Sequence, residues 1–434
     1  MTTPGSPLPR LRPEDLEHRD RTVVVGDTLD QARDIIDDVR ARGAVAVREF
    51  AERFGERSPD QPLHLDRAAL DAALGRIEPE VRGLLERVAN RVQTFAEAQR
   101  DCIAALQVDI PGGTAGHTVV PIERAGCYAP GGRYPLPSSV LMTAVTARAA
   151  GCRHVTVASP EASDLMLAAA AIAGADAFLA VGGDHAVAAL ALGLDDLPRH
   201  DIVVGPGNRW VTAAKQLLQG QVAIDMLAGP SELVILADDT ADPELVAADL
   251  LAQAEHDVDA VPMLLTTSPE LATAVDAALA RQLVDLPTAE TAVAACRNGG
   301  IAVVDDIDHV LALSDRIAPE HLQIMMANPD RIAARIRHAG GIFIGPAAAE
   351  VLGDYGAGPN HTLPTGGTAR FAAGLSVTHF LRLRTWIRHD GAPEAGRELL
   401  ADTAALATLE GLTAHARAAE RRRETVTAST PPAP

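Results

Sequence analysis

The dipeptide Glu320-His321 places a carboxylate beside an imidazole, directly after Pro319. Because neighbouring side chains of a strand point to opposite faces, both groups can serve one pocket more easily in a turn or in the first turn of a helix, where proline fits. A carboxylate and a histidine side by side can divide proton transfer between two successive chemical steps. Alone, the pair is a weak signal, because most Glu-His dipeptides in proteins lie on a solvated surface.

Two other pairs could bind a metal ion or a substrate. Gln253 and His256 stand three residues apart near the end of a predicted helix, so an amide oxygen and an imidazole nitrogen would share one face. Asp354 and His361 belong to a loop rich in glycine and proline, where binding groups are often presented. Each pair has an ordinary alternative: a histidine favoured by the helix dipole in the first, and a polar surface loop in the second.

Glycine turns form a third kind of candidate. Gly205-Pro206-Gly207-Asn208 follows a predicted strand and opens a predicted helix, as a dinucleotide-binding turn would. Trp210, however, stands where the third glycine of that motif belongs, and so bulky a residue would prevent the close helix–strand packing of a standard unit. A tight connection without a ligand is the alternative. Gly131-Gly132 and Gly182-Gly183 likewise permit close approach of a ligand, or merely a turn.

Composition excludes several classes of function. A net charge of −20 argues against nucleic-acid binding, because phosphate recognition needs a basic patch. The four cysteines show no C-x-x-C spacing, which indicates free thiols in a reducing, cytoplasmic compartment. The first 13 residues are polar and rich in proline, so we expect no secretory signal. Residues 165–181 are the most apolar stretch but fall short of a membrane span, and they predict a helix followed by a strand.

From about residue 121 onward, short apolar segments alternate with helical segments. Strand, glycine turn and helix repeated in this order predict βαβ units and a parallel sheet. We therefore predict an α/β fold with two Rossmann-like but incomplete parallel-sheet domains, a helical N-terminal region and a helical C-terminal arm. The predicted strands are Val155–Ala158, Ala177–Val181, Asp201–Val204, Leu233–Leu236, Met263–Thr266, Ile301–Val304 and Ile342–Ile344.

The predicted domain organisation has five parts. Residues 1–19 and 425–434 lack apolar periodicity, so we expect a disordered or draped N-terminus and a disordered tail. Residues 20–120 with 235–377 form the first, discontinuous α/β domain, and 121–234 form the second, with glycine turns. Residues 378–424 form a helical arm. This arm carries Glu410 and His415, for which a solvated helix end is the alternative.

The motifs together, in this order, resemble the histidinol dehydrogenase family. The resemblance extends from roughly Thr28 to Arg417, and accidental similarity of six ordered motifs is excluded in practice. The motifs are Glu123-Arg124-Ala125-Gly126-Cys127-Tyr128-Ala129-Pro130-Gly131-Gly132, Gly205-Pro206-Gly207-Asn208, Ala228-Gly229-Pro230-Ser231-Glu232, Gln253-Ala254-Glu255-His256-Asp257, Ala318-Pro319-Glu320-His321 and Gly358-Pro359-Asn360-His361.

The resemblance implies oxidation of an amino alcohol, L-histidinol, to an amino acid in histidine biosynthesis. The family uses two hydride transfers, two molecules of NAD and one zinc ion per subunit. His321 would be the base in both oxidations, and Glu320 would activate water for the aldehyde step. By similarity, the zinc ligands would be Gln253, His256, Asp354 and His415. The substrate would contact these four residues and also Ser231, Glu320, His361 and Glu410. The NAD contacts would be Tyr128, His185 and Asn208.

The family is also a homodimer in which the C-terminal segment reaches the partner's site, so Glu410 and His415 would serve the other subunit. Two features depart from the histidinol pattern. Asp184-His185 replaces the usual Ala-Gln at a cofactor contact, and residues 132–136 with 145–147 look more like a paralogous branch that oxidises 2,3-dihydroxypropanesulfonate. The alternatives are therefore a paralogue acting on that diol or on another amino alcohol, a zinc hydrolase that uses no nucleotide, and an inactive binding module.

Overall fold

The computed structural model describes the chain except for residues 1–6, 18–25, 132–134, 390–394 and 429–434. The chain divides into two compact units, the first formed by residues 1–100 with 122–380 and the second by residues 101–121 with 381–434. Of the ends expected to be disordered or draped (1–19) or disordered (425–434), residues 1–6, 18–19 and 429–434 lie outside the described residues, as do the paralogue-like residues 132–134. Disorder is wrong for residues 13–17 and 425–428, which are helical. The α/β class predicted from the sequence is confirmed.

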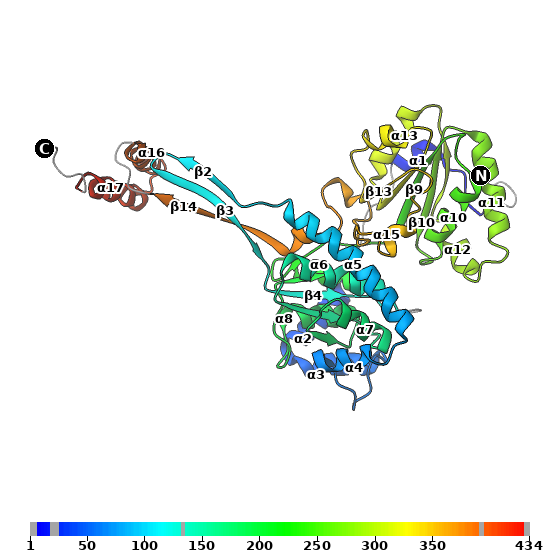
Figure 1. Ribbon diagram of the computed structural model, residues 1–434, viewed down its shortest axis with the longest axis horizontal. Helices are drawn as coiled ribbons and strands as arrows, with labels where there is room; N and C mark the ends of the chain where they lie inside the picture. The colour runs from blue at the N-terminus through cyan, green and yellow to red at the C-terminus, as the bar shows by residue number, and fades with distance from the viewer. Residues whose placement is uncertain (1–6, 18–25, 132–134, 390–394, 429–434) are drawn as a thin grey trace. The chain divides into compact units, whose positions relative to one another are not determined.

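The first unit contains two sheets, which Figure 1 shows in two separate lobes. The first sheet has six strands in the order β1-β6-β5-β4-β7-β8, and all neighbours are parallel except β1 and β6. Its central strands are short apolar runs buried on both faces, as a sheet covered by helices requires. The strands are β1 (His64–Asp66), β4 (Arg124–Tyr128), β5 (His154–Ala158), β6 (Ala177–Leu179), β7 (Ile202–Val204) and β8 (Ala223–Ile224).

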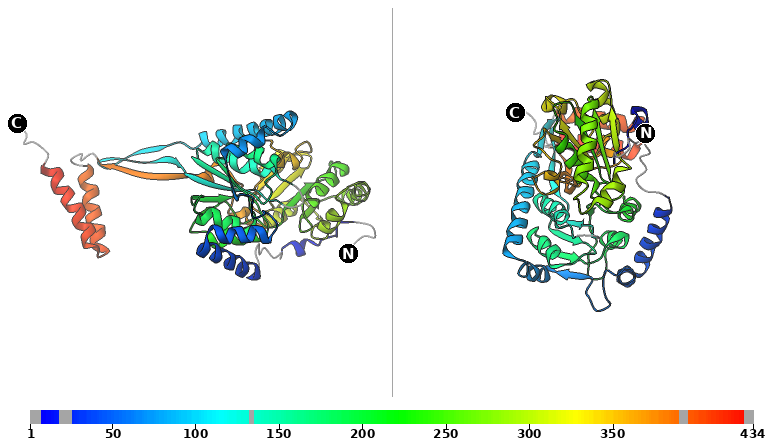
Figure 2. Two further views of the ribbon diagram at one scale, coloured as in Figure 1. Left: turned by 90° about the horizontal axis from the view of Figure 1, so that it is seen from below. Right: turned by 90° about the vertical axis from the view of Figure 1, so that its right-hand side faces the viewer.

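Helices cover both faces of this first sheet. The helices α2 and α3 lie on one side of the lobe and α5 on the opposite side (Figure 2). Alanine predominates in α7 and α8, which allows these helices to pack closely in a core poor in aromatic residues. The helices are α2 (Gly26–Arg42), α3 (Ala44–Arg53), α4 (Arg67–Leu74), α5 (Pro79–Asp101), α6 (Pro137–Ala150), α7 (Asp164–Ile172), α8 (Gly183–Leu192) and α9 (Arg209–Leu218).

The second sheet is entirely parallel, in the order β11-β10-β9-β12-β13. The chain near the N-terminus runs along its edge, where Leu11 donates to the carbonyl of Ile301 and Leu8 is fully buried. The elements of this lobe are α1 (Pro13–Glu17), β9 (Glu232–Ala237), α10 (Pro243–Ala254), β10 (Val261–Thr266), α11 (Pro269–Gln282), α12 (Ala289–Cys296), β11 (Gly300–Val303), α13 (Ile307–Ile317), β12 (His321–Met325), α14 (Pro329–Ala333), β13 (Gly341–Ile344), α15 (Val351–Asp354) and the 3₁₀ helix η1 (Thr368–Arg370). The 3₁₀ helix η2 (Val377–Phe380) packs against α6 of the first lobe.

The second unit is an antiparallel three-stranded ribbon followed by two helices (Figure 1). The strand order is β14-β3-β2, and β14 pairs along its full length with β3. Seven large apolar side chains of this unit are exposed: Leu106, Val108, Leu383, Ile387, Leu406, Leu409 and Leu412. The elements are β2 (Leu106–Ile110), β3 (Gly113–Pro121), β14 (Leu381–His389), α16 (Ala395–Leu409) and α17 (Thr413–Ala428).

The prediction of helix from residue 378 onward is wrong for β14. In Leu381–His389 apolar and polar residues alternate, and this period of two is typical of a strand rather than a helix. The helical prediction holds from Ala395 onward. Among the described residues, no helix is long and apolar enough to cross a membrane, and residues 165–181 form α7 and β6 as expected.

Candidate functional site

The Glu320-His321 pair lies in the turn that joins α13 to β12. The helix ends at Ile317, and Ala318 takes a left-handed conformation with φ 50°, a strained choice for a residue with a side chain. Glu320 lies in the turn, and His321 is the first residue of the strand. The prediction that the pair lies in the first turn of a helix is therefore wrong, and the alternative prediction of a turn is correct for Glu320.

Glu320 is a buried carboxyl group with two hydrogen bonds to one oxygen. Its Oε2 accepts from Ser231 Oγ at 2.7 Å and from the backbone N–H of Glu232 at 2.9 Å. Burial raises the pKa of Glu320 well above its ordinary value, although both hydrogen bonds oppose this shift. The raised pKa suits a group that must take a proton and return it near neutral pH.

His321 is a buried imidazole with one nitrogen free to act as a base. Its Nδ1 lies 3.3 Å from the carbonyl oxygen of Glu232, which can only accept, so we assign the proton to Nδ1. Nε2 is then the basic nitrogen. Burial lowers the pKa of His321 to about 4, so this imidazole is neutral at physiological pH and ready to accept a proton.

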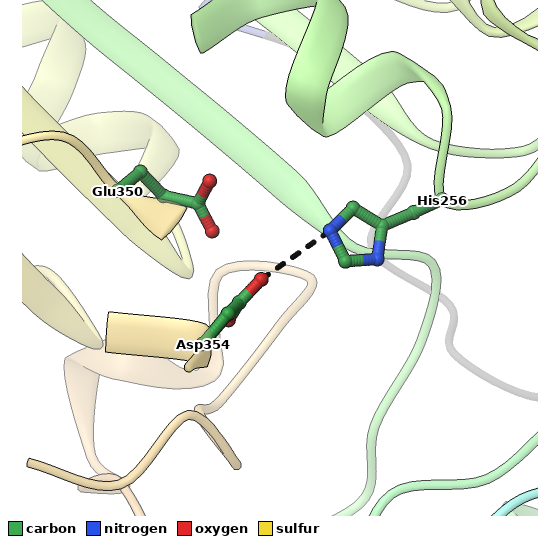
Figure 3. A group of neighbouring side chains, drawn as sticks. All are labelled: His256, Glu350 and Asp354. Carbon is green, nitrogen blue, oxygen red and sulfur yellow. Dashed lines mark ion pairs between the residues drawn. The ribbon is translucent and has the colours of Figure 1, made fainter. Parts of the chain in front are cut away.

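Three acidic and imidazole side chains lie around the basic face of His321. His256, Glu350 and Asp354 form a group in which one ligand atom of each lies within 4.8 Å of the others, and Figure 3 shows them pointing toward one another. His256 Nε2 is 3.4 Å from Asp354 Oδ2. His321 Nε2 is 3.5 Å from Glu350 Oε1 and 3.9 Å from Asp354 Oδ1.

Gln253 supplies an independent sign of a bound cation. This residue is fully buried in the last turn of α10, and among the described residues neither its Oε1 nor its Nε2 has a hydrogen-bond partner. A buried amide without partners is costly, so such a group requires an explanation. An amide oxygen, an imidazole nitrogen and a carboxylate oxygen form a donor set suited to a divalent ion such as zinc. The residues predicted as metal ligands in the first unit therefore fit such an ion.

Glu350 was missed by the sequence reasoning. It is fully buried, and neither of its carboxylate oxygens has a hydrogen-bond partner in the part of the chain that the structure describes. Burial raises the pKa of Glu350, with the nearby Asp354 carboxylate as the next cause. The available signal was its spacing of four residues from Asp354, which would place both groups on one face of a helix.

Asp354 ends the short helix α15 rather than lying in the predicted loop, and the loop that runs from it to His361 is held by the first lobe. Arg91 Nε of α5 donates to the carbonyl of Gly356 at 2.6 Å, and a Cβ on Gly356 would come within 2.5 Å of Val88. His361 Nδ1 lies 3.1 Å from the backbone oxygen of Asp354. Burial by itself would raise the pKa of Asp354, but the hydrogen bond from His256 and the neighbouring histidines lower it. Asp354 is therefore an anion beside the imidazoles.

The site lies at the amino-terminal edge of the second sheet. Ser231 and His321 stand at the starts of the adjacent parallel strands β9 and β12, and Gln253 ends the helix that leads to β10. Open α/β sheets more commonly bind ligands at the opposite, carboxyl edge. Here the negative carbonyl ends of helices such as α10 point toward this edge, which favours a cation there.

Glu410 and His415 belong to the second unit. Glu410 lies in the turn after α16, and His415 lies in the first turn of α17. Both side chains are exposed. Their roles as a substrate contact and a metal ligand stay predictions.

A cavity of about 780 Å³ brings together the three predicted cofactor contacts Tyr128, His185 and Asn208. Tyr128 ends β4, and His185 and Asn208 come after β6 and β7, so all three lie at the carboxyl edge of the first sheet, where α/β folds bind nucleotides. The Tyr128 hydroxyl accepts from the N–H of Gly183 at 3.1 Å. Asn208 caps α9, because its Oδ1 accepts from the N–H groups of Trp210 and Val211.

Removal of His256 should release the metal ion. The variant His256→Ala removes the imidazole that faces Asp354, and we expect the loss of this direct ligand to lower the affinity for zinc by at least about 10²-fold. Dialysis against a weak chelator followed by elemental analysis measures zinc per subunit. The matched control is His154→Ala at the exposed start of β5. Full zinc content in both variants would contradict the assignment of His256.

Comparisons with known proteins agree over almost the whole chain. A family model described as histidinol dehydrogenase matches residues 18–423. A histidinol dehydrogenase of Parasynechococcus marenigrum is 43% identical over 417 residues, 94% of each chain. One of Thermus thermophilus is 44% identical over 396 residues, 90% of this chain and 93% of the relative. The crystal structure of histidinol dehydrogenase from Elizabethkingia anophelis superposes with a TM-score of 0.90 at 30% identity, covering 97% of this chain and 99% of the other.

Proposed function

Because the chain belongs to the histidinol dehydrogenase family, a family of oxidoreductases, we propose that it oxidises L-histidinol to L-histidine through the aldehyde. The proposal includes two NAD-linked steps and one zinc ion per subunit. The observation that carries it is the orientation of His321, whose basic Nε2 faces the group formed by His256, Glu350 and Asp354.

Each group of residues has a proposed partner. Gln253, His256, Asp354 and His415 would hold zinc, and Tyr128, His185 and Asn208 would contact NAD. When bound, zinc orients the amino and imidazole groups of the substrate, and NAD accepts a hydride in each oxidation.

In the first oxidation, His321 Nε2 takes the proton of the substrate hydroxyl as the carbon loses hydride. A neutral imidazole is required, and the low pKa of His321 provides it. The resulting imidazolium has Asp354 Oδ1 3.9 Å from its Nε2, and this carboxylate, whose own pKa is lowered, stabilises the positive charge. Hydride loss and proton loss together convert the alcohol to the aldehyde.

In the second stage, Glu320 takes a proton from water, which adds to the aldehyde carbon. Ser231 and the Glu232 N–H hold Oε2, so Oε1 is the oxygen available to water. His321, after losing its first proton, accepts the proton of the hydrate as hydride leaves again. The product is a carboxylate, and four electrons have been removed in total.

The remaining predicted contacts would bind the substrate. Ser231 and His361 are side chains of the first unit near this group, and Glu410 would pair with the substrate ammonium. We propose a homodimer in which Glu410 and His415 complete the partner's site. The seven exposed apolar side chains of the second unit support this, because so much exposed apolar surface normally marks an interface.

The experiment that tests the substrate is a comparison of initial rates. Zinc-loaded protein is supplied with NAD and either L-histidinol or 2,3-dihydroxypropanesulfonate, and NADH is followed by absorbance. We expect kcat/KM to be higher for L-histidinol by at least about 10²-fold, because the site supplies carboxylates for an ammonium group rather than cations for a sulfonate. Negligible turnover of histidinol would defeat the proposal, and faster oxidation of the diol would favour the paralogue.

The two oxidations should differ in their dependence on pH. His321, with a pKa of about 4, must be neutral, so its contribution is lost only when the pH falls to about 4. Glu320 must be ionised to take a proton from water, and its pKa is raised. As the pH falls, Glu320 therefore loses its activity as a base at a higher pH than His321 does. Single-turnover rates from pH 5 to 9, starting from histidinol or from the aldehyde, should therefore show an acid-side decline only for the aldehyde step. Superimposable profiles would contradict this division.

A further inference from the structure

A buried ion pair, Glu56 with His185, contributes to the lining of the cavity that also contains Tyr128 and Asn208. Glu56 lies in the loop between α3 and β1, and its Oε2 is 2.9 Å from His185 Nε2. The same oxygen accepts from the backbone N–H of Gly182 at 3.2 Å. His185 is 1% exposed and the Glu56 side chain 12%, so the pair is shielded from water and the attraction is little screened.

The surroundings hold this pair in place. The imidazole of His185 lies between Asp184, whose Oδ1 is 3.6 Å from Nδ1, and the rings of Phe50 and Phe54 at 5.8 and 5.5 Å. With Nε2 on Glu56 and Nδ1 beside Asp184, the ring has a carboxylate at each nitrogen. A rotation of His185 that released Glu56 would therefore leave a buried carboxylate without its partner.

The carboxylate of Glu56 occupies the position that a helix offers to anions. The helix α8 begins at Gly183, and the N–H groups at its start carry partial positive charge. The Glu56 carboxylate accepts a hydrogen bond from the N–H of Gly182, and the Tyr128 hydroxyl accepts one from the N–H of Gly183. Side chains of this chain thus already occupy the N–H groups of Gly182 and Gly183 at the amino end of α8.

The rest of the cavity is also acidic. Its lining includes the carboxylates of Asp34, Glu161 and Asp184 besides that of Glu56, and Arg53 brings a guanidinium. An anionic dinucleotide that enters the cavity is repelled by these carboxylates. Its phosphates also cannot accept from the N–H groups of Gly182 and Gly183, which already have side-chain acceptors. Removal of the Glu56 charge would reduce the repulsion and leave only a neutral, weaker acceptor on the Gly182 N–H.

We propose that Glu56, held by His185, is a built-in competitor that weakens binding of the phosphate groups of the nucleotide. The inference rests on the proposed use of NAD and goes beyond it, because it assigns to Glu56 a control of cofactor affinity. It also gives the departure at Asp184-His185 a physical consequence, since His185 is the residue that anchors the competing carboxylate.

The test compares dissociation constants for NAD, ADP and uncharged adenosine. Trp210 lines the cavity, so quenching of its fluorescence reports occupancy without substrate or turnover. In Glu56→Gln the amide oxygen can still accept from Gly182, but the charge is gone. We expect NAD and ADP to bind about tenfold more tightly than in the unmodified protein, with adenosine unchanged.

Two further variants sharpen the result. His185→Gln should release Glu56 and tighten ADP binding less than Glu56→Gln does. The matched control is Glu52→Gln, which removes the same charge from an exposed position of α3 and should leave all three constants within about twofold. Unchanged or weaker ADP binding in both Glu56→Gln and His185→Gln overturns the inference, and so does an equal gain for adenosine.

Failure of this inference differs from failure of the proposed function. If the unmodified protein reduces NAD with L-histidinol while Glu56→Gln binds NAD no more tightly, the claim that Glu56 competes with the nucleotide phosphates is wrong and the proposed function stands. If no variant binds any nucleotide and no NADH forms, the proposed use of NAD is wrong and the inference falls with it.

Discussion

The variant His321→Asn is expected to lower the rates of both oxidations by about 10²–10⁴-fold, the usual contribution of a general base. Asparagine can still donate from its amide to the carbonyl oxygen of Glu232, as His321 Nδ1–H does, but it offers no basic nitrogen toward Glu350 and Asp354. The measurement is a single-turnover rate from histidinol and a separate one from the aldehyde.

The control for His321→Asn is His309→Asn, which makes the same chemical change in the first turn of α13. Its rates should stay within about twofold of those of the unmodified protein, as expected of a change remote from the reacting atoms. Zinc content should be unchanged in both variants. A fall in only one of the two oxidations would show that His321 does not serve as the common base.

The variant Glu320→Gln is expected to stop the reaction halfway. Its amide oxygen can still accept from Ser231 Oγ and from the Glu232 N–H, so the turn keeps its hydrogen bonds. The amide has no negative charge with which to take a proton from water. Oxidation of the aldehyde should therefore slow by about 10²–10⁴-fold, while oxidation of the alcohol stays within a few-fold.

Rapid mixing with histidinol separates these steps. The unmodified protein should form two NADH per histidinol, and Glu320→Gln should form one rapidly and the second very slowly. Glu290→Gln on the exposed side of α12 is the control, and it should form two. Equal loss of both NADH phases in Glu320→Gln would mean that the two residues do not divide the proton transfers as proposed.

Much of the fold could be predicted because its strands are short apolar runs that end at glycine or before a helix. Residues 177–179, 202–204 and 232–237 lie wholly in the core, and their composition is that of buried parallel strands. The strand Leu381–His389 was missed because its apolar side chains are partly or largely exposed, so no buried run reveals it. Its alternation was the available signal.

The site could be predicted less completely, for a physical reason. Local sequence shows that Glu320 and His321 are adjacent, but it cannot show that Ser231, 89 residues earlier, donates to Glu320, because this contact depends on strand pairing. Glu350 follows three alanines, and its spacing of four residues from Asp354 is only a weak local sign of chemistry. Its importance emerges only when the fold buries it, without a hydrogen-bond partner among the described residues, against His321.

The most direct test of the account is anomalous diffraction at the zinc edge from crystals of the zinc-loaded protein. We expect one anomalous peak per subunit, about 2.0–2.2 Å from a nitrogen of His256, an oxygen of Asp354 and the amide oxygen of Gln253, with His415 as a further ligand. A peak bound elsewhere, or no peak between His256 and Asp354 in zinc-loaded crystals, would contradict the claim that these side chains converge on one ion beside His321.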